Sequence, residues 1–406
     1  MSESTVLAAL GLDEPDEVLA ALAAGPRAID CPHLGSGRLV FPRYREVRQL
    51  LRDPRFLCAP TARGMLEDLP AQMRELLEPV ALWILYADPP LHSSLRGVMA
   101  KAFTARHISA LQESIAAEAD SLVASFVQAN GGDAVANLAE PLPVHTISTL
   151  MGLDSSTSAR LKTWSDDVVL LTEPELSADE QARLAEAWRG LSGYFVELIE
   201  SRRRSPQSDI VSAMVHAEAD GMILNEEELV ANCIALLVGG HETTSSLLSS
   251  LVLAALEHRD ARDRVLEDRT YAAGFVEEVL RLHGPSKITA RTAACDVEVG
   301  GVQIRAGRRL ILLQASANRD PEVFSDPSEF LPERSPNPHV GFGFGAHACF
   351  GAALARMQAV AFLRSFMAAA EGLELDSSQV TWKPSQVLRT PARIPVQAAA
   401  ARRSYA

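Results

Sequence analysis

An unusually apolar stretch from Leu229 to Leu256 limits most strongly what this chain can fold into. The stretch is long enough to cross a bilayer, but His241 and Glu242 lie at its middle, and small polar residues are scattered along it. Ionisable side chains at the centre of a bilayer are costly. The sequence therefore predicts a long helix that is buried in a protein core, and no membrane span.

Apolar residues at helical spacing are also the commonest pattern in the rest of the chain. They occupy most of residues 108–282, and a further helix is expected to begin after Pro90. Nearer the N-terminus, residues 38–56 predict a short strand, a helix and a turn that contains proline. The protein is therefore expected to be mainly α-helical.

A change of pattern near Thr292 predicts a small β part. Short alternating segments are followed by an irregular Pro-rich stretch, a helix from Cys349 and a β-like C-terminus. No repeat or linker divides the chain. We expect residues 1–406 to form a single domain, of class mainly α with a small β part, in which about 1–20 is a loose N-terminus.

Charge and cysteine content exclude several classes of protein. The formal net charge of −14 over 406 residues disfavours binding to nucleic acid, which needs clustered Lys and Arg. The five cysteines are scattered and form no C-x-x-C pair, so neither a disulfide framework nor a zinc ribbon fits. The first residues lack the basic segment of a signal peptide. We therefore expect a cytoplasmic protein.

One cysteine differs from the others in its surroundings. Cys349 follows a run that contains Gly343 and Gly345, and it comes directly before a predicted helix. Glycines let a backbone turn pass close to a flat object. The unpaired N–H groups of a helix N-terminus favour the thiolate, which is the form that ligates a metal. On these features alone, a buried structural cysteine remains the alternative.

The same run resembles the haem-binding signature of the cytochromes P450, Phe-x-x-Gly-x-x-x-Cys-x-Gly. Phe342, Gly345, Cys349 and Gly351 match it without a gap. The resemblance, to the soluble bacterial type, implies haem b with Cys349 as the axial thiolate ligand of its iron. It places Phe342 and Gly351 beside the haem and His347 at a haem propionate. The fold it implies is a triangular α-rich domain with a long central helix over the haem.

Two adjacent glycines interrupt the long apolar helix before its polar centre. In a helix interior Gly239 and Gly240 cost on the order of 1 kcal/mol each relative to alanine, so something must offset them. Close approach of another helix and a functional gap both account for them. The segment resembles the oxygen-binding groove of the P450 family. By that resemblance Glu242 and Thr243 are the acid and the alcohol that deliver protons for oxygen activation.

A second family motif is Glu-x-x-Arg, matched by Glu278 and Arg281. Taken alone, such a pair on one helix face is an ordinary surface ion pair of small energetic value. Arg334 resembles the arginine that completes a buried triad with this pair in the family. The resemblance therefore implies a structural role for these residues on the haem side of the core.

Four residues resemble the family's ligands of the haem propionates. His92 and Arg96 lie four apart and share a helix face, although a solvated face is the alternative. Arg291 and His347 complete the set. Two carboxylates that are buried with a haem need several cationic donors, because an unpaired buried charge is expensive.

The substrate pocket is predicted only by position in the family, and most of its residues are small or apolar, which suits a lipophilic ligand. The positions are Ala235, Val238, Gly239, Lys287, Val387 and Leu388. Lys287 is the exception, because an apolar residue is frequent there. Its ammonium is expected to meet an acidic or acceptor-rich group of the substrate, or else to point to solvent or to a propionate.

The resemblance extends from about residue 35 to about residue 396 and implies a monooxygenase. Such an enzyme inserts one oxygen atom of O2 into a lipophilic small molecule, here a polyketide, terpenoid or steroid-like compound of specialised metabolism. The chain has no flavin or iron–sulfur motif, so electrons from NAD(P)H are expected to arrive through a ferredoxin and its reductase. A haem-thiolate peroxygenase or dehydratase is one alternative, and a non-catalytic haem sensor is another.

Overall fold

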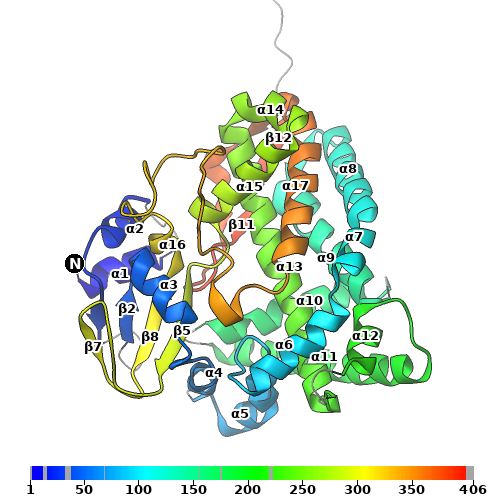
Figure 1. The fold of residues 1–406 in the computed structure, drawn as a ribbon. Coiled ribbons are helices and arrows are strands. Elements are labelled where there is room, and N and C mark those ends of the chain that lie inside the picture. Colours follow the sequence, from blue (N-terminus) through cyan, green and yellow to red (C-terminus); the bar gives the residue numbers. More distant parts are fainter. Residues whose placement is uncertain are drawn as a thin grey trace, which may run out of the picture.

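The computed structural model describes residues 2–11, 16–32, 38–67, 69–154, 156–173, 176–218 and 223–398. The α-helices are α1 (Glu3–Ala9), α2 (Asp16–Ala23), α3 (Tyr44–Arg52), α4 (Ala59–Leu66), α5 (Ala71–Leu77), α6 (Leu91–Ala102), α7 (Ala105–Ala110), α8 (Gln112–Gln128), α9 (Pro141–Met151), α10 (Ser158–Val169), α11 (Ala178–Arg204), α12 (Ile210–His216), α13 (Glu226–Glu257), α14 (Arg262–Glu267), α15 (Arg269–His283), α16 (Gln314–Ala317) and α17 (Ala352–Ala369). The strands are β1 (Ile29–Cys31), β2 (Arg38–Phe41), β3 (Phe56–Leu57), β4 (Gly131–Asp133), β5 (Ile288–Ala293), β6 (Val297–Val299), β7 (Val302–Ile304), β8 (Arg309–Leu313), β9 (Leu373–Leu375), β10 (Thr381–Trp382), β11 (Pro391–Arg393) and β12 (Pro395–Ala398). Figure 1 shows the sheet strands β2, β5, β7 and β8 on one side of the molecule and the larger helices on the other, so the expected fold class, mainly α with a small β part, is confirmed.

Helix α13 runs through the middle of the helical part, as the apolar stretch predicted (Figure 1). It begins with a capping box: the side chain of Asn225 accepts from the Glu228 N–H at 2.9 Å, and the Glu228 carboxylate accepts from the Asn225 N–H at 2.9 Å. Helices α9, α10, α11, α15 and α17 pack around it. The helix is therefore held at the centre of the core and carries its polar middle there.

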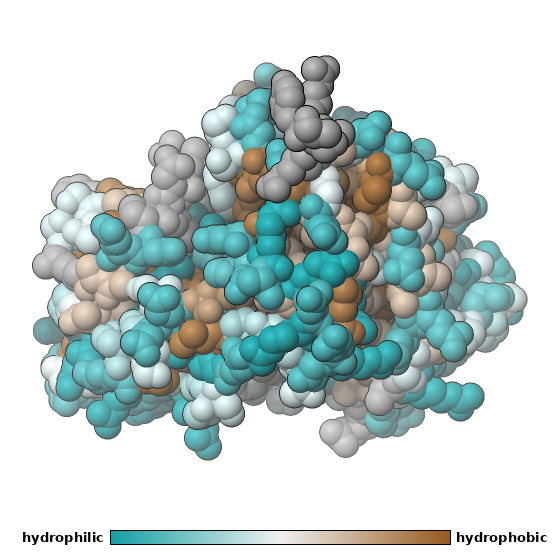
Figure 2. Space-filling view, turned by 90° about the horizontal axis from the view of Figure 1, so that it is seen from above, coloured by the Kyte–Doolittle hydropathy of each residue, from teal (hydrophilic) through white to brown (hydrophobic). Residues whose placement is uncertain are grey.

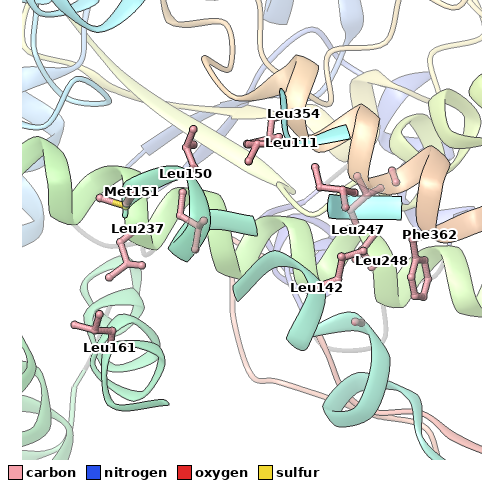
Figure 3. Packing of buried hydrophobic residues seen from close by; sticks show 14 of the residues in the cluster. Leu111, Leu142, Leu150, Met151, Leu161, Leu237, Leu247, Leu248, Leu354 and Phe362 are labelled. Carbon is pink, nitrogen blue, oxygen red and sulfur yellow. The ribbon is translucent and has the colours of Figure 1, made fainter. Parts of the chain in front are cut away.

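The main hydrophobic core surrounds α13 on several sides. Figure 3 shows buried side chains from three of its neighbours converging on it; those labelled include Leu142, Leu150, Met151, Leu161, Leu237, Leu247, Leu248, Leu354 and Phe362. Burial of a large aliphatic side chain stabilises the fold by about 1.5–3 kcal/mol. This packing fixes the register of α13 against α9, α10 and α17.

A five-stranded sheet, in the order β1-β2-β8-β5-β3, forms the other part of the fold. Strands β2 and β8 are parallel, and the remaining pairs are antiparallel. Because side chains alternate between the faces of a strand, Val40 and Ile311 pack with α1 and α2, whereas Phe41 and Leu312 pack on the opposite face with α3.

The expectation of a loose N-terminus over about 1–20 was wrong for the residues that the structure describes there. Helices α1 and α2 pack on the sheet and bury Val6, Leu10, Leu19 and Leu22. These apolar residues recur at helical spacing, and Asp16 and Glu17, between them, are exposed. The polar composition of the segment concealed an amphipathic pattern.

The surface carries hydrophilic residues over most of the face seen in Figure 2, with hydrophobic residues in small groups between them. Within the described ranges, no helix combines the length and the hydropathy that a bilayer span requires. Helix α13 is long enough, but its buried polar residues, among them His241 and Glu242, keep it out of this class.

Candidate active site

The glycine-rich run before Cys349 forms a tight turn that packs on α3. Gly343 and Gly345 have φ angles of 69° and 77°, a region that side-chain-bearing residues rarely adopt. A Cβ on Gly345 would also lie 2.8 Å from the carbonyl oxygen of Leu51. The turn is closed by the Cys349 N–H, which donates to the carbonyl oxygen of Phe342 at 2.8 Å. Glycine is therefore required at position 345 for both conformation and space.

Cys349 itself has open space in front of its side chain and is accessible, although protein surrounds it on the other sides. Burial raises the pKa of its thiol, while the backbone N–H of Gly351 and the guanidinium groups of Arg356 and Arg96 act to lower it. The helix expected from Cys349 begins later, at Ala352. Nearby N–H groups and cations therefore favour the thiolate, against the burial that favours the thiol, and Cys349 does not lie inside the first helical turn.

The four predicted cationic ligands meet in one place. The rings of His92 and His347 are in contact, tilted by 38°, with centroids 4.0 Å apart. Arg96 donates to the carbonyl oxygen of Ala348 at 3.1 Å, and Arg291 is buried. Burial lowers the pKa of His347 to about 3, and the positive charges of Arg291 and Arg96 add to the effect. The guanidinium groups of Arg96 and Arg291 thus bring positive charge next to the cysteine turn, while the lowered pKa values of His92 and His347 favour neutral imidazoles.

Helix α13 opens onto free space at Gly239. No heavy atom lies within 4 Å of a Cβ built there, among the described residues, and Gly239 is exposed although it lies in the middle of a buried helix. At Gly240, in contrast, a Cβ would come within 2.8 Å of Cδ1 of Ile147 in α9. Close approach of another helix therefore accounts for Gly240, whereas Gly239 borders the open space that a functional gap would need.

The predicted acid and alcohol face different partners. The Thr243 hydroxyl donates to the carbonyl oxygen of Gly239 at 2.7 Å, on the open face of the helix. Glu242 is buried, and its Oε1 accepts from Nζ of Lys383 at 2.9 Å. Lys383 follows β10 and is far away in the sequence, so sequence analysis missed it. The structure brings both predicted residues to one stretch of α13, and it shows an ion pair that holds the carboxylate.

The buried triad has the predicted members. Arg281 donates from Nε and Nη2 to the Glu278 carboxylate at 2.8 and 2.7 Å, and Arg334 donates from Nε at 3.0 Å. Both Glu278 and Arg281 have fully buried side chains. Burial alone would raise the pKa of Glu278, but the hydrogen bonds from Arg281 and from the backbone of Leu331 lower it. The surface alternative is thereby excluded.

The arginine that holds the start of α17 was not predicted. Arg356 makes a bidentate pair with Glu277, at 2.7 and 2.8 Å, and its guanidinium lies 4.5 Å from the ring centroid of Phe342. This contact links the cysteine turn to α15. Its sequence signal is weak, because no recognised motif marks either residue.

The pocket positions fall into two groups. Ala235, Val238 and Gly239 are partly accessible on α13, and Val387 and Leu388 are half-buried in the segment before β11. Lys287 does not belong with them. It is 2% exposed, and its ammonium donates to backbone carbonyl oxygens of the chain.

The assignment of Lys287 to the substrate pocket was therefore wrong. Its ammonium binds backbone carbonyl oxygens and not the substrate group, solvent or propionate that we expected. Its acceptors within the described residues include the carbonyl oxygens of Leu10 at 3.1 Å, Gly11 at 3.3 Å and Ser385 at 2.7 Å. The lysine fastens the end of α1 to the segment that follows β10. A position in a family pattern gave no information about this contact, because the N-terminal segment lies outside the pattern.

Comparison with known proteins connects this geometry to one family. The cytochrome P450 family model matches residues 81–394. Nocardicin C N-oxygenase of Nocardia uniformis subsp. tsuyamanensis is 36% identical over 87% of this chain and 88% of its own length. Mycinamicin IV hydroxylase/epoxidase of Micromonospora griseorubida is 34% identical over 90% of each chain. The crystal structure of P450BioI with acyl carrier protein ligated to hexadec-9Z-enoic acid has a TM-score of 0.88 at 29% identity and covers 95% of this chain and 98% of that one.

The residues present fit a haem. Among the described residues, Nε2 of His92 is buried without a hydrogen-bond partner, next to a cluster of positive charge that two propionates would neutralise. Cys349 supplies a thiol with open space in front of it, and Gly239 leaves space along α13. Cys349 would hold the iron, and His92, Arg96, Arg291 and His347 would hold the propionates.

Proposed function

Since the chain belongs to the cytochrome P450 family and is a haem-thiolate monooxygenase, we propose that it oxidises a lipophilic small molecule of specialised metabolism. One atom of O2 enters the substrate and the other leaves as water, with two electrons and two protons from outside. The observation that carries the proposal is the open face of α13 at Gly239, bordered by Ala235 and Val238. Two of the relatives named above are a nocardicin C N-oxygenase and a mycinamicin IV hydroxylase/epoxidase, and the structure named above is a complex with acyl carrier protein ligated to hexadec-9Z-enoic acid.

Bound haem supplies the redox-active iron that activates O2, and electron donation from its thiolate favours cleavage of the O–O bond. The protein's own residues then supply position and protons. The Thr243 hydroxyl, which donates to the carbonyl oxygen of Gly239 on the open face of α13, would turn toward the haem side, give up its proton there and take one from the Glu242 carboxyl. The Glu242 carboxyl replaces that proton, and Lys383 holds the carboxylate in place between turnovers.

The substrate class is tested by titrating the purified holoenzyme with a long-chain fatty acid, a steroid and a macrolide, with glucose as the hydrophilic control. We expect a saturable spin-state change in the absorption spectrum with at least one lipophilic compound and none with glucose. If all three lipophilic compounds left the spectrum unchanged, the proposed class would be wrong.

The role of Thr243 is tested by Thr243→Ala, with the neighbouring Thr244→Ala as the matched control. Loss of the hydroxyl should lower the product formed per NAD(P)H and raise the peroxide released, because protons no longer reach the reacting oxygen in the right order. Thr244 is buried, whereas the Thr243 hydroxyl lies on the open face, so the Thr244 variant should stay coupled. Full coupling in Thr243→Ala would contradict the role.

A ferredoxin is the proposed electron donor, and a groove beside the cysteine turn is its proposed docking site. The groove has a volume of about 890 Å³ and is lined by exposed Arg45, Arg48, Arg52 and Arg55 together with Phe344. The Arg48 guanidinium lies 4.4 Å from the ring centroid of Phe344, which is in the same turn as Cys349. Positive charge here, in a chain of net charge −14, suits an acidic partner.

The supply of NAD(P)H makes the cytoplasm the proposed compartment.

Reversal of one charge tests this docking site. Arg48→Glu should raise the KM for a reduced acidic ferredoxin roughly tenfold and weaken its salt dependence. The matched control is Arg204→Glu, at the exposed end of α11, which makes the same charge change away from the groove. Equal KM values for the two variants would argue that the donor docks elsewhere.

A further inference from the structure

A second carboxylate lies close to Glu242 and comes from a neighbouring helix. Asp166 of α10, His241 and Glu242 each offer a polar atom, and these atoms lie within 4.8 Å of one another. Nδ1 of His241 is 3.6 Å from Oδ1 of Asp166. Glu242 and His241 are buried, whereas the Asp166 side chain is 30% exposed. The cluster therefore reaches from the buried acid of α13 to the edge of solvent.

A small cavity adjoins the cluster between α9, α10 and α13. Its volume is about 10 Å³, which is room for one water molecule. Its walls include Ser165 and His241, whose side-chain Oγ and ring nitrogens have no hydrogen-bond partner within the described residues. Figure 3 shows two apolar members of the wall, Leu161 of α10 and Leu237 of α13, pointing toward each other. A water here would have polar partners on one side and an apolar enclosure on the other.

The charges around the cluster exclude a metal site. Lys162 of α10 binds Asp166 at 2.7 Å and Glu140 at 3.1 Å, and Lys383 binds Glu242 at 2.9 Å. Two ammonium groups thus already neutralise the carboxylates that a cation would need. Burial lowers the pKa of His241 to about 4, so its ring is neutral at physiological pH. What remains is two carboxylates and a neutral imidazole beside a cavity with room for one water molecule.

We propose that Asp166 relays protons from solvent to Glu242. This inference rests on the proposed role of Glu242 and names the step before it. Asp166 acts through Glu242 and touches neither substrate nor haem. Lys162 and His241 position it, the first through its ammonium and the second through a ring nitrogen near Oδ1.

The transfer conserves charge at each step. A proton from solvent binds an oxygen of Asp166, passes through one bridging water to the Glu242 carboxylate, and replaces the proton that Glu242 has passed toward Thr243 Oγ1. A separation of up to 4.8 Å is within the span of two hydrogen bonds of about 2.8 Å through one water. Asp166 then takes a new proton from solvent, to which its side chain is open.

Turnover of the holoenzyme tests the relay. Asp166→Asn should lower kcat about tenfold, less than the 10²–10⁴-fold typical of a direct general acid, and should raise the solvent deuterium isotope effect. Asp166→Glu should restore most of the rate. The matched control is Asp167→Asn, which removes the adjacent carboxylate and its ion pair with Arg183, at 2.7 Å, on another side of the same helix. We expect its kcat and isotope effect to match those of the parent enzyme.

Combination with Glu242→Gln separates the two claims. If Glu242→Gln itself leaves kcat unchanged, the proposed role of Glu242 fails and the relay fails with it. If Glu242→Gln slows turnover but Asp166→Asn does not, the relay alone is overturned. The proposal predicts that the double variant is no slower than Glu242→Gln, because both residues act on one path; multiplied effects would contradict it.

A second readout needs no turnover. Burial raises the pKa of Asp166, the hydrogen bond from Lys162 lowers it, and the charge of Glu242 raises it further. The charged and titratable groups that face it are Lys162, Glu140, His241, Glu242 and Lys383. Difference infrared titration of the substrate-free holoprotein should show a carboxyl band that Asp166→Asn removes and whose midpoint Glu242→Gln lowers. A midpoint that Glu242→Gln does not move would overturn the relay.

Discussion

Lys287→Met should detach the N-terminal helix α1. The buried ammonium donates to the carbonyl oxygens of Leu10, Gly11 and Ser385. Hydrogen bonds with a charged donor contribute about 1.5–3 kcal/mol each, or roughly 4.5–9 kcal/mol for three, and removal of the ammonium from water costs several kcal/mol. Methionine fills a similar volume but removes the charged donor from these three carbonyl oxygens. The expected net loss is about 3 kcal/mol.

Hydrogen exchange of the holoenzyme measures this loss locally. About 3 kcal/mol corresponds to roughly 100-fold faster exchange, and we expect it in the amides of α1 and not in those of α13. The matched control is Lys101→Met, which removes an exposed lysine that donates to the carbonyl oxygen of Glu218. Unchanged exchange in α1 together with altered substrate affinity would refute the reasoning and return Lys287 to the pocket.

Three further outcomes follow from the same contacts. Burial would raise the pKa of Glu277, but hydrogen bonds from Arg356 and His339 lower it to about 2. Its ionised form therefore adds stability above the unfolded pKa of about 4.3, and this stability is lost as pH falls toward the folded value. Arg356→Gln should make stability depend less on pH between these two pKa values, which acid unfolding monitored by circular dichroism measures. Gly239→Ala should raise the free energy of unfolding in urea by about 1 kcal/mol and weaken substrate binding. Gly240→Ala should not raise the free energy of unfolding, because the side chain of Ile147 must shift. An equal rise in both variants would contradict the packing at Gly240. Glu278→Gln leaves Arg281 and Arg334 without their carboxylate and should cost about 3–5 kcal/mol in the same assay; an unchanged midpoint would show that other acceptors suffice.

Local patterns predicted the parts of the site that are written in consecutive residues. The turn before Cys349, the glycine pair of α13 and the pair of Glu278 with Arg281 each occupy a short segment, so spacing along the chain determines their geometry. The long apolar helix was predictable for the same reason. Its burial follows from composition alone.

Contacts between distant segments were not predictable in this way. Lys383 meets Glu242 only because the segment after β10 folds back on α13, and Asp166 meets His241 only because α10 crosses the same helix. A lone lysine or aspartate carries no pattern that names its partner. Lys287 shows the converse error. Its family position suggested a pocket, whereas two of its acceptors, the carbonyl oxygens of Leu10 and Gly11, belong to a segment outside the pattern.

The account depends most on thiolate ligation by Cys349, and the absorption spectrum of the dithionite-reduced protein with carbon monoxide tests it directly. We predict a Soret band strongly red-shifted from that of a histidine-ligated haem, lost in Cys349→Ser. It should be kept in Cys58→Ser, which removes the buried thiol 3.5 Å from Nε2 of His347. An unshifted band in the parent protein, or a shifted band that survives in Cys349→Ser, would contradict the assignment and the function built on it.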